Sequence, residues 1–150
     1  MYKKILVALE NGEADKRLLP HITALAKQVG AELLLLHVAD GFAARNFEQL
    51  NLAESEEIKA DRTYLESTAA GLRTDGLTVA VQLAMGNPPN EIVKVAGDSN
   101  CNLIALASHG HKLIGDLVYG STIDKVRHNT SIPLLVVSAV RSATKAPFGG

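Results

Sequence analysis

One segment of the chain constrains the fold more than any other, because it joins a buried strand to a helix through a loop that carries glycines. Residues 103–107 form an unbroken apolar run, which is typical of a strand covered on both faces. Three glycines follow before Ser121, and Ile123 and Val126 then recur at helical spacing, so a helix is predicted to begin near Ser121. Glycines let backbone N–H groups approach a ligand closely, and the first turn of a helix offers unpaired donors. The segment can therefore hold an anion.

Segments typical of strands and of helices alternate along the whole chain. This alternation predicts an α/β fold with an open five-stranded parallel sheet, right-handed crossovers and helices on both faces. Ligands bind to such sheets beyond the carboxyl ends of the strands, where the strand order reverses. If the first and fourth strands are neighbours there, their ends line one crevice. The predicted strands are 5–9, 32–38, 77–84, 103–107 and 133–137. Two predicted helices run from about 18 to 29 and from about 53 to 73, and two more begin at 88 and near 121.

Particular residues mark where the predicted helices begin and end. Gly30 follows the first helix as a C-cap. Pro20 lies inside that helix and removes a backbone hydrogen bond, so the helix is expected to begin late or to bend there. Asn87 is a candidate N-cap, with a proline at the first helical position after it. The charges at 54–62 are interpreted as the solvent-exposed face of a helix, and 40–51 as a loop that crosses the end of the sheet.

The overall composition excludes several classes of protein. A length of 150 residues suits one domain, predicted to span 1–140 with a flexible tail at 141–150. A net charge of −1 provides no field that would attract nucleic acid or an acidic membrane surface. The apolar runs fall short of the roughly 20 residues of a membrane helix, and Glu10 ends the first run too early for a signal peptide. Cys101 is the single cysteine, expected to be a buried or half-buried thiol; this usage suits a reducing compartment and predicts a cytoplasmic protein.

A glycine pattern and four flanking segments carry a resemblance to a known family. The pattern is glycine, two residues, glycine, nine residues, then Gly-Ser or Gly-Thr, and here it reads Ala107, Gly110 and Gly120-Ser121 at that spacing. The other matching segments are 5–10, 36–38, 86–88 and 133–137. On these residues the chain resembles the universal stress proteins over nearly its full length.

The resemblance implies a Rossmann-like sheet, similar to that of adenine nucleotide α-hydrolases, that often forms a homodimer through its last strand. In one branch of the family ATP is bound, with or without Mg²⁺. The end of the first strand would approach the adenosine, the end of the second would contact adenine through its backbone, and the glycine loop would meet ribose and phosphates. The residues at matching positions are Ala8, Leu9, Glu10, Val38, Leu106, Ala107, His109, Gly110, Gly120, Ser121 and Thr122.

Two of these positions depart from the family's pattern. Ala107 replaces the first glycine, and its methyl group would crowd a ligand if the backbone there needed a positive φ. Glu10 stands where the ATP-binding branch usually has an aspartate, which is one methylene shorter. A family member that kept the fold and works as a nucleotide-free dimeric interaction module therefore stays open as the alternative function.

Catalytic and metal functions find little support in the sequence. The chain has no Walker loop and no Gly-x-Ser-x-Gly elbow, and Glu10-Asn11-Gly12 stands in place of a pyrophosphatase-type Ser-Gly-Gly-x-Asp-Ser loop. We therefore expect no designed fast catalysis, and at most slow ATP hydrolysis. His109 and His111 lack a Cys, Asp or Glu partner at ligand spacing, so no metal site is predicted. His37, at the end of a predicted strand, is interpreted as a packing residue.

Overall fold

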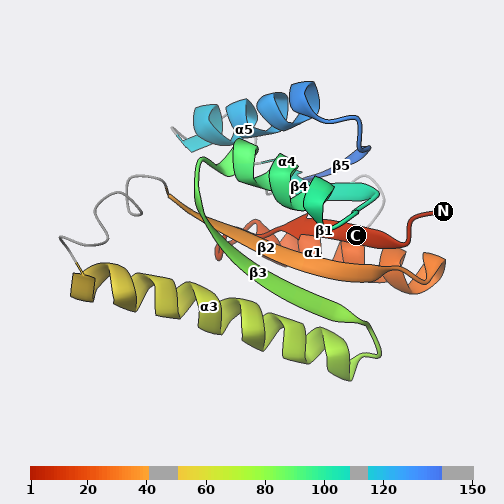
Figure 1. The fold of residues 1–150 in the computed structure, drawn as a ribbon. Coiled ribbons are helices and arrows are strands. Elements are labelled where there is room, and N and C mark those ends of the chain that lie inside the picture. Colours follow the sequence, from red (N-terminus) through yellow and green to blue (C-terminus); the bar gives the residue numbers. More distant parts are fainter. Residues whose placement is uncertain (41–50, 109–114, 140–150) are drawn as a thin grey trace, which may run out of the picture.

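The computed structural model describes residues 1–40, 51–108 and 115–139, and their side chains over 1–39, 56–108 and 121–139. Within these residues strands and helices alternate (Figure 1). The predicted tail at 141–150, and all but the two ends of the predicted loop at 40–51, lie outside the described residues. The elements are β1 (Lys4–Ala8), α1 (Asp15–Val29), β2 (Glu32–Asp40), α3 (Asn51–Thr74), β3 (Val79–Gly86), α4 (Pro88–Asp98), β4 (Leu103–Ser108), α5 (Gly115–Asn129) and β5 (Leu134–Ser138).

The strands form one parallel sheet in the order β3-β2-β1-β4-β5, which confirms the predicted fold class. β1 lies at the centre, with Leu6 between Leu34 of β2 and Ile104 of β4. The chain moves outward from β1 to β3 and then crosses to β4 on the other side of β1. The strand order therefore reverses between β1 and β4, and the expectation that the first and fourth strands are neighbours is confirmed.

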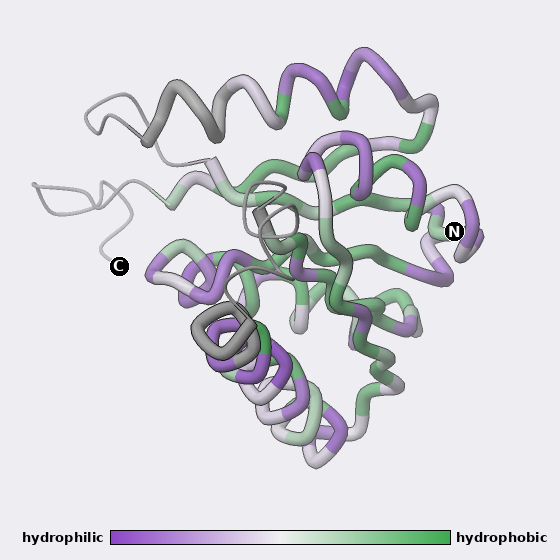
Figure 2. The backbone as a smooth tube through the Cα atoms, turned by 60° about the vertical axis from the view of Figure 1, so that its left-hand side comes forward, coloured by the Kyte–Doolittle hydropathy of each residue, from purple (hydrophilic) through white to green (hydrophobic). Residues whose placement is uncertain are grey.

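Two pairs of helices cover the two faces of the sheet. α1 and α3 bury Leu18 and Leu65 in one core, and α4 and α5 bury Ile92 and Val126 in the other. Successive residues of a strand point to opposite faces, so Leu6 belongs to the second core while its neighbours in β1 belong to the first. The strands are drawn largely in green in Figure 2, whereas α3 carries long purple stretches. Apolar runs covered on both faces are what this arrangement requires.

The first helix begins earlier than expected. α1 starts at Asp15 and contains Pro20, so of the two expectations, a late start or a bend at Pro20, the late start was wrong. Leu18 is fully buried and Asp15 nearly so, and burial of this face outweighs the single backbone hydrogen bond that a proline removes. Gly30 ends the helix as predicted, in a left-handed conformation with φ of 72° and its N–H donating to the Ala26 carbonyl.

The helix after β3 begins as predicted. The Asn87 side chain accepts a hydrogen bond from the backbone N–H of Asn90 at 3.2 Å, and Pro88 is the first residue of α4. This cap places Pro88 and Ile92, one turn later, close to the carboxyl ends of β1 and β2, where both line a cavity described below.

The last helix begins before its predicted position. α5 starts at Gly115, so Gly120, Ser121 and Thr122 lie inside the helix and not at its N-terminus. The prediction treated Gly120 as a boundary, but a glycine inside a helix costs only about 1 kcal/mol relative to alanine. The backbone N–H groups of residues 120–122 consequently belong to the hydrogen-bond ladder of the helix.

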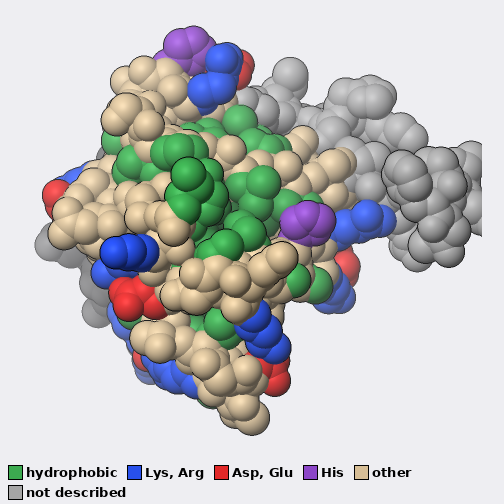
Figure 3. Space-filling model, turned by 90° about the vertical axis from the view of Figure 1, so that its right-hand side faces the viewer, with side chains coloured by type: hydrophobic (Ala, Val, Ile, Leu, Met, Phe, Trp, Pro, Cys, Tyr) green, Lys and Arg blue, Asp and Glu red, His purple; other side chains and the backbone are tan. Residues whose placement is uncertain are grey.

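The end of the sheet at which the strands begin faces the viewer in Figure 3. Hydrophobic side chains gather in the middle of this surface, and charged side chains lie around them. Cys101 precedes β4 and is 5% exposed, which confirms the expected buried thiol. Burial raises the pKa of the Cys101 thiol, which disfavours the reactive thiolate.

Candidate functional site

A cavity of about 550 Å³ lies at the carboxyl ends of the central strands, where the strand order reverses. Its walls come from β1, β2 and β4, from the segment after β1, and from α3, α4 and α5. The volume is within the range of roughly 300–1,000 Å³ that small-molecule sites occupy. This is the position at which a sheet of this topology binds ligands.

The structure brings together most of the predicted site residues that it describes. The cavity is lined by Ala8, Leu9, Glu10, Val38, Leu106, Ala107 and Thr122. Ser121 is exposed and precedes Thr122 in α5, and Gly120 lies in the same stretch of helix. His109 and Gly110 fall outside the described residues, as do His111 and most of the loop that carries the glycine pattern.

The segment after β1 is held by a buried carboxylate that the sequence analysis did not identify. Asp15 is 1% exposed and its two oxygens accept hydrogen bonds from the backbone N–H groups of Glu10, at 3.0 and 3.2 Å, and of Asn11, at 2.9 Å. Asn11 adopts a positive φ of 61°, a conformation that asparagine tolerates better than most residues. Asp15 thereby fixes the turn that presents Glu10 and Asn11 to the cavity.

Tyr64 of α3 is a further hydrogen-bond partner of Asp15. Its hydroxyl donates to Asp15 Oδ2 at 2.6 Å, which links α3 to the start of α1. Burial of the ring, together with this hydrogen bond and the neighbouring negative charge, raises the pKa of the Tyr64 hydroxyl strongly, so the neutral donor form is maintained.

A second polar link joins α3 to the ends of β1 and β2. His37 Nδ1 lies 2.9 Å from the Leu9 carbonyl oxygen, and its Nε2 lies 3.2 Å from Asp61 Oδ2. The other oxygen of Asp61 accepts a hydrogen bond from Asn11 Nδ2 at 3.1 Å. The side chains of His37 and Asp61 are each only 14% exposed. His37 is thus more than the packing residue that was predicted, because both of its ring nitrogens have polar partners.

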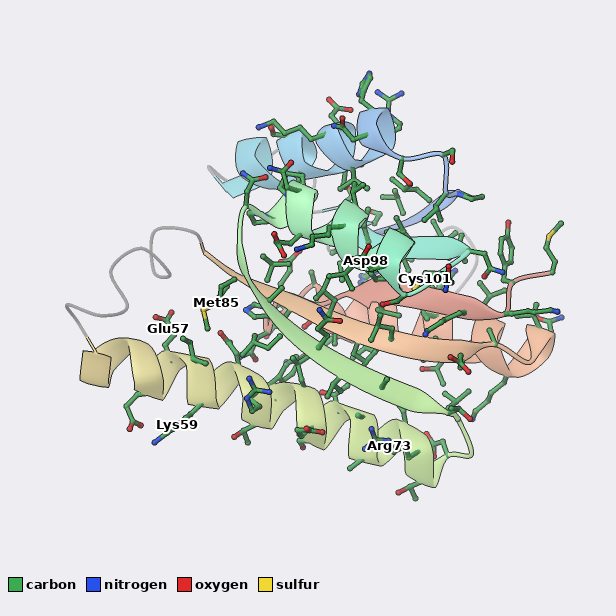
Figure 4. The ribbon with its side chains drawn as sticks, viewed as in Figure 1. Glu57, Lys59, Arg73, Met85, Asp98 and Cys101 are labelled. Carbon is green, nitrogen blue, oxygen red and sulfur yellow. The ribbon has the colours of Figure 1, made fainter. Side chains whose placement is uncertain are left out.

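The described walls of the cavity are acidic on one side. Glu10, Glu57 and Asp61 contribute carboxylates there, and no Lys or Arg is among the described lining residues. Glu57 lies near the start of α3 (Figure 4). In the part of the chain that the structure describes, no group of three His, Cys, Asp or Glu side chains is arranged to hold a metal ion.

Sequence reasoning missed Asp15, Asp61 and the polar role of His37. Asp61 belongs to the charged run interpreted as a solvent-exposed helix face, and nothing in that run distinguishes it from its neighbours. The position of His37, directly before Val38 at the end of a central strand, is the one signal that could have flagged it. Asp15 could have been suspected only from the first turn of α1, whose start was itself predicted too late.

Comparison with known proteins identifies the family. The family model described as Universal stress protein family matches residues 1–138. The chain belongs to the universal stress protein family. Among curated relatives, the universal stress protein MJ0577 of Methanocaldococcus jannaschii is 30% identical, over 95% of this chain and 98% of that protein. The universal stress protein YxiE of Bacillus subtilis is 26% identical, over 91% of this chain and 99% of the relative.

Solved structures of other universal stress proteins share the fold. A structure of MJ0577 superposes with a TM-score of 0.80 and 29% identity, over 96% of this chain and 99% of that one. The universal stress protein UspA from Lactobacillus plantarum gives a TM-score of 0.77 at 20% identity, over 91% of this chain and 97% of that one. The described helices of this universal stress protein include none with the length and apolar character needed to cross a membrane.

Proposed function

We propose that this universal stress protein binds an adenine nucleotide, ATP, in the cavity at the switch point of the sheet, and that it acts as a regulatory protein in the stress response. The observation that carries the proposal is the cavity itself. It has the volume of a small-molecule site, and its walls contain Ala8, Leu9, Glu10, Val38, Leu106, Ala107 and Thr122, all of which the family resemblance assigns to the nucleotide.

The charge of the walls supports one orientation of the ligand. The carboxylates of Glu10, Glu57 and Asp61 would repel phosphates from the side that α3 closes. That side suits the uncharged nucleoside, with adenine against the backbone of Val38. The phosphates would lie toward α5 and the glycine pattern, where Thr122 already lines the cavity.

The departures from the family's pattern are compatible with this proposal. Ala107 pairs with Val137 in regular parallel strand geometry, and it is absent from the residues with positive φ, so its methyl group causes no backbone strain. Mg²⁺ would enter with the phosphates, since no described cluster of side chains is arranged to hold it.

Solved universal stress proteins in complex with cAMP and with dAMP have the same fold as this chain. They are 16% and 19% identical to it, so they support the fold alone and the proposal rests on the cavity of this protein. Isothermal titration calorimetry with ATP and Mg²⁺ tests it, with micromolar to sub-millimolar binding expected. Absence of both heat and a thermal shift at millimolar ATP would exclude nucleotide binding.

We expect no fast turnover of the bound nucleotide. Hydrolysis needs a positioned water and neutralisation of the developing charge, and the described walls offer carboxylates but no Lys or Arg. Release of ADP and phosphate should therefore be slow. Release of AMP and pyrophosphate at enzymatic rates would instead indicate an α-hydrolase-like enzyme.

The exposed edge of the sheet favours a dimer, which is also the basis of the second candidate function. Among the residues that the structure describes, β5 pairs with β4 on one side only, and Val136 is 43% exposed. An unpaired apolar edge strand can be completed by a symmetry mate, so we propose a homodimer through β5. Light scattering should report a dimer for the wild type and a monomer for Val136→Lys; a wild-type monomer would contradict this.

The second candidate is a nucleotide-free dimeric interaction module. Under this alternative Ala107→Gly, which restores the family's first glycine, would create ATP binding that the wild type lacks. Under the leading proposal the wild type already binds, and Ala107→Gly changes the affinity only modestly. We further propose a cytoplasmic location, in keeping with the single buried thiol, which cell fractionation would test.

A further inference from the structure

We propose that His37 and Asp61 position the α3 wall of the pocket by sharing a single proton, so that nucleotide binding weakens as pH rises. The expected pH dependence of ATP affinity rests on the proposed nucleotide function. The shared proton itself rests only on the positions of the described side chains. Both residues line the cavity and both are largely withdrawn from solvent.

The proton requirement follows from the partners of the His37 ring. Nδ1 faces the Leu9 carbonyl oxygen at 2.9 Å, and a backbone carbonyl can only accept. Nδ1 must therefore carry a hydrogen. Nε2 faces Asp61 Oδ2 at 3.2 Å, and a carboxylate likewise only accepts. Both contacts can be hydrogen bonds only if each ring nitrogen carries a hydrogen. The His37–Asp61 pair then holds one proton more than a neutral ring beside an ionised carboxylate.

Loss of that proton changes an attraction into a repulsion. A neutral ring that keeps its hydrogen on Nδ1 turns the lone pair of Nε2 toward the negative Asp61 oxygen. The two groups then separate, because a charge-assisted hydrogen bond has been replaced by two acceptors in contact. The separated state binds one proton fewer, so rising pH favours it and falling pH favours the closed pair.

The pair matters to the pocket because it connects elements that are distant in the sequence. Asp61 also accepts from Asn11 Nδ2 at 3.1 Å, so one carboxylate ties α3 both to β2 and to the turn after β1. Asp61 and its helix neighbours Glu57, Ile58 and Ala60 all line the cavity. When the pair separates, this wall is released from the strand ends against which the nucleoside would rest.

The charged groups around the pair come from three elements. Glu10 follows β1, Glu57 lies one turn before Asp61 on α3, and Asp15 at the start of α1 holds the turn that carries Asn11. The lining residues contributed by α4 and α5 are uncharged: Pro88, Ile92, Thr122 and Ile123. The charged residues that line the described part of the pocket beside the pair are therefore carboxylates.

Asp61→Asn separates this proposal from a merely structural role. The new amide keeps an oxygen to accept from Asn11 and gains an N–H that donates to Nε2 of a neutral His37 ring. All three contacts can then form without the shared proton. The variant should bind ATP about as tightly as the wild type does at mildly acid pH and keep that affinity at mildly alkaline pH, where the wild type should weaken roughly tenfold.

Two further variants complete the experiment. His37→Gln can donate to Asp61 but loses the Leu9 contact, so it should bind several-fold more weakly, with no pH dependence from this pair. His128→Gln removes an exposed histidine of α5 whose Nδ1 lies 2.7 Å from the Asp124 carbonyl and which is absent from the lining of the pocket. It should keep the wild-type pH profile. Titration of the ATP phosphates affects every variant equally, so the comparison cancels it.

Thermal unfolding of the ligand-free full-length protein across the same pH range makes the two proposals separable. The melting temperature of the wild type should fall with rising pH more steeply than that of Asp61→Asn. If the two proteins show the same pH dependence in both melting and ATP affinity, the shared proton is refuted. If no protein binds ATP but the melting curves differ as expected, the shared proton is supported and the nucleotide function fails.

Discussion

The two sides of the pocket are built in different ways. On the α3 side, polar contacts of His37, Asp61 and Asn11 join residues far apart in the sequence, with Asp15 holding the turn beside them. On the α5 side the described wall consists mainly of apolar residues that follow one another along β4 and α5, such as Leu106 and Ile123. The first side depends on particular polar partners, whereas the second depends on shape.

This difference determines which amino-acid substitutions each side tolerates. Removal of one member of a buried polar network leaves its partners unsatisfied and is costly. A wall defined by shape fails instead when its volume changes. Substitutions in the polar network should therefore act mainly on stability, and substitutions in the shaped wall mainly on affinity.

Asp15→Ala should have the largest effect on stability. It leaves the N–H groups of Glu10 and Asn11 and the Tyr64 hydroxyl without their acceptor in a buried site, at an expected cost of about 3–4 kcal/mol in the free energy of unfolding. Urea denaturation measures this cost. Glu13→Ala, in the same turn but with a highly exposed side chain, should change stability by less than about 0.5 kcal/mol. Equal effects of the two substitutions would contradict the role given to Asp15.

Ala107→Leu should have the largest effect on binding through shape. The longer side chain would fill part of the cavity at the end of β4, and ATP affinity should fall by roughly tenfold to a hundredfold. Calorimetry measures the affinity, and circular dichroism checks that the variant is folded. Ala80→Leu places the same side chain at an exposed position of β3 that does not line the pocket, and it should leave affinity unchanged.

Tyr64→Phe tests the raised pKa of the Tyr64 hydroxyl. At neutral pH the loss of one hydrogen bond to Asp15 should cost about 1–2 kcal/mol. Above about pH 10 an unfolded tyrosine loses its proton, whereas folded Tyr64 keeps it. The folded state then binds more protons, so wild-type stability falls as pH rises further, and Tyr64→Phe should lack this part of the decline. Urea midpoints measured at alkaline pH decide the matter; parallel curves for the two proteins would refute it.

Asn87→Ala should have the smallest of these effects. It removes the acceptor for the Asn90 N–H at the start of α4, which is expected to cost about 1 kcal/mol of stability. ATP affinity should change little, since α4 contributes Pro88 and Ile92 to the pocket and both remain anchored. Asn87→Asp keeps an acceptor and should remain close to the wild type in thermal unfolding. A large loss of affinity in Asn87→Ala would show that the α4 wall depends on more than shape.

Local signals predicted most of the fold. The apolar runs at 5–9 and 103–107 and the caps at Gly30 and Asn87 are properties of short segments, and each appears in the structure close to its predicted place. The start of α5 was predicted wrongly, since the weak helix preference of glycine was treated as a boundary.

The sequence predicted site residues on the α5 side of the pocket and missed polar residues on the α3 side. Ala107 and Thr122 were predicted as site residues through the family resemblance, and both line the cavity. Asp15 and Asp61 were not predicted, because a carboxylate on a helix has no mark in the sequence that separates a buried network from a solvated surface. Their roles depend on which face of α1 and α3 meets the ends of β1 and β2.

The amino-acid sequence alone therefore determined the fold class, the family resemblance and the edge of the sheet at which a ligand would bind, because these depend on periodicity and on motifs within short segments. Only the tertiary structure decided which polar side chains meet across the pocket. Contacts such as the 3.2 Å approach of His37 Nε2 to Asp61 Oδ2 join residues whose separation in space is set by the packing of a whole helix against the sheet. No local pattern encodes that distance.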